Sequence, residues 1–175
     1  LYRMLDEGAI EEIDEELSLN MYDTLTDRLA AAGYEHYEIS NFALPGFRSR
    51  HNSSYWHEIP YIGIGAAAHS YDRQTRQWNV PNLEAYLSAI EQGRIPCEAE
   101  TIDEATRYDD LVTTALRTRE GINVHTLTPP YREHLLRQAQ PYIDRGLLDM
   151  EQGQLHLTRQ GIYISDSIMA DLMYV

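Results

Sequence analysis

The chain has 175 residues, of which 43% are hydrophobic and 24% charged, as in an ordinary globular protein. Its 14 basic and 28 acidic residues give a net charge of −14, which argues against nucleic acids and anionic membranes as partners, because both bind basic surfaces. The single cysteine, Cys97, excludes an internal disulfide and any cluster or zinc site built from this chain's cysteines, and it favours a reducing, cytoplasmic setting.

The first half of the chain alternates predicted helices and strands. Asp14 can cap a helix whose apolar residues recur every four positions, and Gly33 can end that helix in a left-handed conformation. A strand is predicted over 36–42, followed by a Pro-Gly turn, a polar loop and a small-residue strand over 61–68. This order is typical of a parallel α/β structure.

The second half is predicted to be mainly helical. Its expected elements are a short helix after Pro81, a connector over 93–100, a helix behind a capping box at 101–104, a helix starting at Thr128-Pro129, a hairpin over 147–157 and a last helix capped by Thr158. We therefore expect two domains: an α/β domain over 1–95, and an α+β domain over 100–175 that is helical and winged-helix-like.

The densest cluster of unusual residues is R-H-N-S-S-Y-W at 50–56, which we place on a loop between two strands. His51 could ligate haem iron, Tyr55 and Trp56 could cover the macrocycle, and arginines such as Arg50 pair well with propionate carboxylates. From composition alone, a surface or packing role remains the commoner one for a histidine in this setting.

Two further segments could contact a ligand. Gly63 and Gly65 would let the backbone approach a ligand closely, although tight strand packing explains them equally well. Ser40 and Asn41 could donate hydrogen bonds at a strand end, where an ordinary polar strand exit is the simpler explanation. The other histidines have no metal-ligand spacing, and no catalytic triad can be argued from spacing.

Three motifs follow one another in the first half: Y-E-I-S-N-F-A at 37–43, R-H-N-S-S-Y-W at 50–56 and G-I-G-A-A-A-H-S at 63–70. In this order they resemble the second half of the radical-SAM core in HemW-type haem chaperones, relatives of oxygen-independent coproporphyrinogen III oxidase. G-L-L at 146–148 and L-T-R-Q-G at 157–161 resemble that family's C-terminal domain.

The resemblance implies that the first half contains the last strands and helices of a partial (β/α) radical-SAM barrel. It also implies a haem site with His51 as the iron ligand, completed by Arg50, Tyr55 and Trp56. Ile64, Gly65 and Ala66 would lie near the adenosyl group of S-adenosylmethionine.

The sequence departs from the family in one respect. The family holds a [4Fe–4S] cluster through a C-x-x-x-C-x-x-C motif that this chain lacks. We interpret the chain as a C-terminal fragment whose whole protein uses a [4Fe–4S] cluster, S-adenosylmethionine and haem, and we expect no radical chemistry from the fragment alone.

Three functions remain open at this stage. The whole protein could bind haem and deliver it to an acceptor protein, or it could decarboxylate coproporphyrinogen III oxidatively. In a third hypothesis, the chain is a winged-helix module that contacts other proteins. An open sheet edge and an apolar face would also favour self-association.

Overall fold

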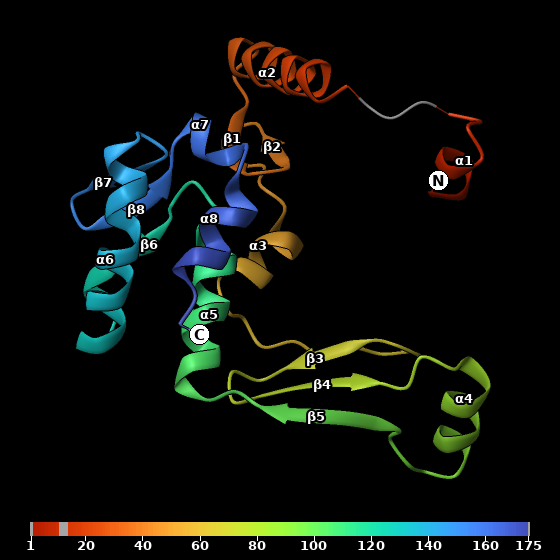
Figure 1. The fold of residues 1–175 in the computed structure, drawn as a ribbon. Helices are drawn as coiled ribbons and strands as arrows, with labels where there is room; N and C mark the ends of the chain where they lie inside the picture. Colours follow the sequence, from red (N-terminus) through yellow and green to blue (C-terminus); the bar gives the residue numbers. More distant parts are fainter. Residues whose placement is uncertain (1, 11–13, 175) are drawn as a thin grey trace. The chain divides into compact units, whose positions relative to one another are not determined.

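The computed structural model describes residues 2–10 and 14–174 (Figure 1). Internal contacts divide the chain into two units, Leu1–Arg48 and Ser49–Val175. The domain boundary predicted between residues 95 and 100 falls inside the second unit, and it stays a prediction. None of the described helices is long and apolar enough to cross a membrane.

The first unit contains two helices and two strands. They are α1 (Tyr2–Asp6), α2 (Glu15–Ala31), β1 (Glu35–Glu38) and β2 (Asn41–Ala43). Asp14 caps α2, as predicted, by accepting the backbone N–H of Leu17 at 3.1 Å. Gly33 follows α2 with a φ of +85°, the left-handed conformation expected after a helix end.

The segment predicted as one strand over 36–42 is an antiparallel hairpin of β1 and β2. The buried carboxylate of Glu38 accepts the backbone N–H of Ser40 at 3.1 Å and a hydrogen bond from the side-chain amide of Asn41. These bonds stabilise a turn between the strands, so Ser40 and Asn41 organise the hairpin locally.

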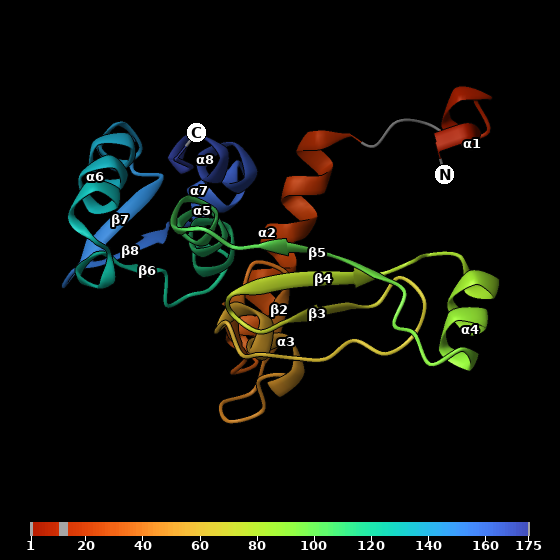
Figure 2. The ribbon, with the colours of Figure 1, turned by 90° about the horizontal axis from the view of Figure 1, so that it is seen from below.

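The second unit begins with a helix and a three-stranded antiparallel sheet, of order β3-β4-β5 (Figure 2). These elements are α3 (Arg50–Trp56), β3 (His69–Tyr71), β4 (Thr75–Asn79), α4 (Leu83–Glu91) and β5 (Cys97–Thr101). The predicted helix after Pro81 is present as α4. The predicted connector over 93–100 contributes most of β5, which pairs with β4.

The small-residue strand predicted over 61–68 does not form. Within it, Tyr61 makes an isolated bridge with Tyr71, and the side chains of Ile62 and Ile64 are 86% and 88% exposed. A strand needs a neighbour along its length, whereas only the end of this segment is paired: the Ala67 N–H donates to the Val80 carbonyl at 3.1 Å, and the Ala68 carbonyl accepts the Asn79 N–H at 2.9 Å. All strand pairs among the described residues are antiparallel, so the expected parallel arrangement is absent from them.

The rest of the second unit contains helices around a second three-stranded antiparallel sheet, of order β6-β8-β7. Its elements are α5 (Glu104–Ala115), β6 (Ile122–Asn123), the 3₁₀ helix η1 (Val124–Thr126), α6 (Pro129–Asp144), β7 (Leu148–Glu151), β8 (Gln154–Leu157), α7 (Arg159–Ile162) and α8 (Ser165–Leu172). The hairpin and the helices predicted here are confirmed, except that the single last helix expected after Thr158 is two helices, α7 and α8. Asp103, rather than Thr101, caps α5, and Thr158 caps α7 as expected.

The main core lies between these helices and the second sheet. Its fully buried aliphatic side chains are Val112, Leu116, Ile122, Leu135, Leu148, Leu155, Ile168 and Leu172. They come from α5 and its C-cap residue, from α6 and α8, and from all three strands. Burial of this apolar surface is therefore the main force that holds the region together.

Candidate functional site

The segment predicted as a ligand-binding loop at 50–56 is the helix α3. Ser49 begins it by accepting the backbone N–H of Asn52 at 3.2 Å, and His57 ends it. Serine is a strong N-cap residue, so this local signal could have revealed the helix from the sequence. A helix, unlike a loop, fixes which of the motif's side chains share one face.

His51 and Tyr55 lie one helical turn apart and form a pair on the exposed face of α3. Their ring centroids are 5.1 Å apart at an angle of 84°, and Nε2 of His51 lies 3.3 Å from the Tyr55 hydroxyl oxygen. Both side chains are solvent-exposed, Tyr55 at 40%. The Nδ1 atom of His51 makes no hydrogen bond to the described residues, so it is open to an external ligand.

Arg50 and Trp56 lie differently. The exposed guanidinium of Arg50 makes no polar contact in the described part of the chain. Trp56 is turned by about 100° around the helix from Tyr55. The guanidinium carbon of Arg117 lies 5.4 Å from the centre of its ring, and its Nε1 is buried without a partner. Trp56 therefore packs against the protein, whereas Arg50 and the His51–Tyr55 pair face solvent.

In the second predicted ligand segment, Ile64 to Ala66, the backbone groups of Gly65 are hydrogen-bonded to side chains of other residues. The N–H of Gly65 donates to the Tyr86 hydroxyl at 3.2 Å, and its carbonyl accepts the side-chain amide of the buried Asn79 at 2.8 Å. Gly65 has a φ of +114°, which other residues rarely adopt. No hydrogen bond or ring contact joins this segment to His51, so the two predicted sites are not united by direct contacts.

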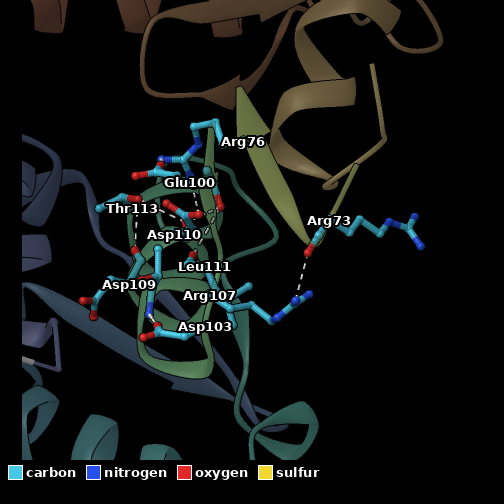
Figure 3. A network of polar contacts seen from close by, with 11 residues as sticks. Arg73, Arg76, Glu100, Asp103, Arg107, Asp109, Asp110, Leu111 and Thr113 are labelled. Atoms are coloured by element: carbon cyan, nitrogen blue, oxygen red, sulfur yellow. Dashed lines mark hydrogen bonds and ion pairs between the residues drawn. The ribbon is translucent and has the colours of Figure 1, made fainter. Parts of the chain in front are cut away.

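A charged network that the sequence analysis missed links the first sheet of the second unit to α5. Figure 3 shows the guanidinium of Arg76, on β4, directed toward Glu100 and Asp110. Its nitrogens lie 3.1 Å from the Glu100 carboxylate and 2.5 Å from that of Asp110. Burial works to lower the pKa of Arg76, but the hydrogen bond that it donates to Asp110 and the two negative charges outweigh burial and raise that pKa.

Tyr55, Tyr61 and Tyr71 line a cavity of about 180 Å³ together with Arg76 and Asp110. Burial is the main cause that raises the pKa of both Tyr61 and Tyr71, so the two phenols are neutral at physiological pH. Thr75 and Trp78, residue types that favour strands, were a weak signal for β4, but no sequence signal indicated that Tyr61 pairs with Tyr71.

The described residues hold no group of three or more His, Cys, Asp or Glu side chains arranged to bind a metal ion. Cys97 is exposed on β5. What the arrangement can offer is a single solvent-facing imidazole beside a phenol, with a free guanidinium one residue away. The imidazole could ligate one open position of a metal that is already held by another molecule, such as a porphyrin.

Comparison with solved structures identifies the class of fold. The structure matches coproporphyrinogen III oxidase (HemN) from Escherichia coli, a radical-SAM enzyme, with a TM-score of 0.68 at 16% identity, over 92% of this chain and 42% of that one. The chain therefore has the fold of part of a radical-SAM protein.

Comparison with curated sequences is more specific. Heme chaperone HemW from Lactococcus lactis is 31% identical over 165 residues, which cover 92% of this chain and 43% of that protein. HemW from Mycobacterium tuberculosis H37Rv is 30% identical over 174 residues, 99% of this chain and 44% of that protein. The resemblance to HemW-type radical-SAM proteins is confirmed over nearly the whole chain, which spans less than half the length of these relatives. The sequence matches no protein-family model.

Proposed function

We propose that this chain contributes the haem-binding residues of a haem chaperone, with His51 as the iron ligand. The observation that carries the proposal is the exposed His51 imidazole, whose Nε2 pairs with Tyr55 while its Nδ1 is open. Metal-ligating histidines commonly donate their second ring N–H to a fixed partner, which orients the ring. In this arrangement Nδ1 meets the iron and Nε2–H donates to the Tyr55 oxygen.

The surroundings of His51 suit a flat, dianionic cargo. The exposed ring of Tyr55 offers apolar contact to the macrocycle, and the free guanidinium of Arg50 can pair with a propionate carboxylate. Trp56 was expected to join them, but because its ring packs beneath Arg117, we assign it to holding α3 in place. The cargo would pass to an acceptor protein.

For the whole protein we propose the [4Fe–4S] cluster and S-adenosylmethionine that the radical-SAM resemblance implies. This chain's donors do not fit the cluster, because cluster irons need several thiolates and the chain has one cysteine. The segment from Ile64 to Ala66 does fit a nucleoside, since its backbone is anchored and the Ile64 side chain is 88% exposed. S-adenosylmethionine would supply radical chemistry there, and Ile64 would give its adenosyl group an apolar contact.

The test is an absorbance titration of the 175-residue chain with ferric haem. His51→Ala should weaken binding by about 100-fold, since losing even an outer partner of a metal ligand costs about 10- to 100-fold, and it should change the Soret band. His57→Ala is the matched control, because His57 ends the same helix with Nδ1 bonded to the Ser53 carbonyl at 2.6 Å. A His51→Ala chain with unchanged affinity and Soret band would refute the assignment.

We further propose that α5, β6, α6, β7 and β8 form a winged-helix-like domain. Their chain order and the sheet order β6-β8-β7 support this. Because the whole chain carries a net charge of −14, we expect such a domain to contact proteins, the haem acceptor among them, rather than nucleic acid. A cytoplasmic setting is supported by the exposed thiol of Cys97, which persists in a reducing compartment.

A further inference from the structure

We propose that Tyr61 positions the haem-ligating histidine: its ring supports Tyr55, and through Tyr55 it orients the imidazole of His51. This inference rests on the proposed role of His51. It gives Tyr61, which lies outside the three sequence motifs, a role in orienting the iron-ligating imidazole.

The helix α3 depends on contacts with the rest of its unit. It has seven residues, and a helix of that length is not stable in isolation. Two aromatic contacts hold its C-terminal half. One is the Arg117 guanidinium over Trp56, and the other is the edge-on packing of Tyr55 against Tyr61, with ring centroids 5.0 Å apart at 77°. The second contact is made by the residue that hydrogen-bonds His51.

Tyr61 is itself fixed to a sheet. Its backbone N–H donates to the Tyr71 carbonyl and its carbonyl accepts the Tyr71 N–H, both at 2.9 Å. Tyr71 belongs to β3, which pairs with β4, and the two tyrosine rings lie 6.0 Å apart. The ring that supports Tyr55 is therefore attached to a hydrogen-bonded scaffold rather than to a free loop.

The ring of Tyr61, and not its hydroxyl, makes the supporting contact. That hydroxyl forms no hydrogen bond with the described residues, and the ring borders a cavity of about 180 Å³ that Tyr55 and Tyr71 also line. Removing the ring would enlarge this cavity and free Tyr55 to change rotamer. The His51 Nε2 would then lose its fixed partner.

The experiment compares Tyr61→Ala, Tyr61→Phe and Tyr34→Ala in the 175-residue chain by ferric haem titration and urea unfolding. Tyr34 is an exposed tyrosine of the first unit with no ring contact to described residues. An edge-on aromatic pair is worth about 2- to 10-fold in an equilibrium. We expect Tyr61→Ala to weaken haem binding by about that factor and to shift the Soret band toward that of His51→Ala, while Tyr61→Phe and Tyr34→Ala bind like the parent chain.

The outcomes separate this inference from the proposed function. If His51→Ala abolishes ligation but Tyr61→Ala leaves affinity and Soret band unchanged, Tyr61 has no positioning role and His51 keeps its own. A Tyr61→Phe chain as weak as Tyr61→Ala would also overturn the inference, because the hydroxyl would then be essential. Should Tyr61→Ala fail to fold, Tyr61→Leu takes its place, since it keeps apolar volume without an aromatic edge, and the same two criteria apply.

Discussion

In the second unit, some polar side chains face solvent, whereas others link secondary-structure elements to one another. His51 and Arg50 face solvent with unused hydrogen-bonding groups, as binding residues must before their ligand arrives. Arg76 is the opposite case, because both of its acceptors lie within the protein. Its bond to Asp110 joins residues that are 34 positions apart in the chain, so it ties β4 to α5.

The two carboxylates on Arg76 should contribute unequally to stability. The Asp110 side chain is 30% exposed and that of Glu100 is 44% exposed, so the Asp110 bond is better shielded from water. We expect Asp110→Asn to lower the free energy of unfolding by about 1–2 kcal/mol. Glu100→Gln should lower it by less than about 1 kcal/mol, as for a surface ion pair. Urea unfolding of both variants measures this, and a larger loss for Glu100→Gln would contradict it.

The helices of this protein show how local capping signals set element boundaries. Ser49, Asp103 and Thr158 each accept a backbone N–H three residues ahead, at the start of α3, α5 and α7. At Asp103, the hydrogen bond from the Thr106 backbone favours the ionised form and holds the pKa of the carboxyl below its usual value. The charge also interacts favourably with the positive end of the helix dipole.

This cap should make stability depend on pH in a defined direction. Because the pKa of Asp103 is lowered by folding, its contribution is present above the unfolded pKa of about 3.9 and is lost as pH falls through the folded value. Asp103→Asn keeps an acceptor without the charge, so it should be less stable than the parent chain at pH 7 and equal to it at low pH. Asp103→Ala should be the least stable variant at pH 7.

Urea midpoints for the three chains, taken across the acid range, test the cap. If Asp103→Asn is less stable than the parent chain by the same amount at every pH, the charge of Asp103 does not contribute to the stability of the cap.

At the scale of the whole molecule, burial is distributed unevenly between the two units. The large buried cluster is drawn from residues 108 to 172, whereas in the first unit the buried residues are Tyr37, Glu38 and Ala43 among those described. The apolar residues Leu17, Met21 and Leu25, which predicted an amphipathic helix, form α2 but remain exposed. Stability of the 175-residue chain should therefore come mainly from the second unit.

Matched leucine substitutions test this distribution. Leu135, on α6, is fully buried, so Leu135→Ala should lower the free energy of unfolding by about 2–5 kcal/mol through lost burial and a residual cavity. Leu17→Ala, at a position 55% exposed on α2, should change it by no more than about 0.5 kcal/mol. Chemical unfolding followed by circular dichroism gives both values, and equal losses would contradict the uneven distribution.

The sequence by itself determined the helix caps at Asp14 and Thr158, the hairpin over 147–157 and the resemblance to HemW-type proteins. These features depend on residues that are close together in the chain or on the order of motifs along it, so they can be predicted from the sequence. The tertiary structure decided that 36–42 folds back as a hairpin, that 62–68 forms no strand and that Tyr61 packs against Tyr55 of the His51–Tyr55 pair. These contacts depend on which distant segments meet in the folded chain. A backbone group can hydrogen-bond to many partners and a ring can pack against many others, so the packing of the whole unit selects the partner.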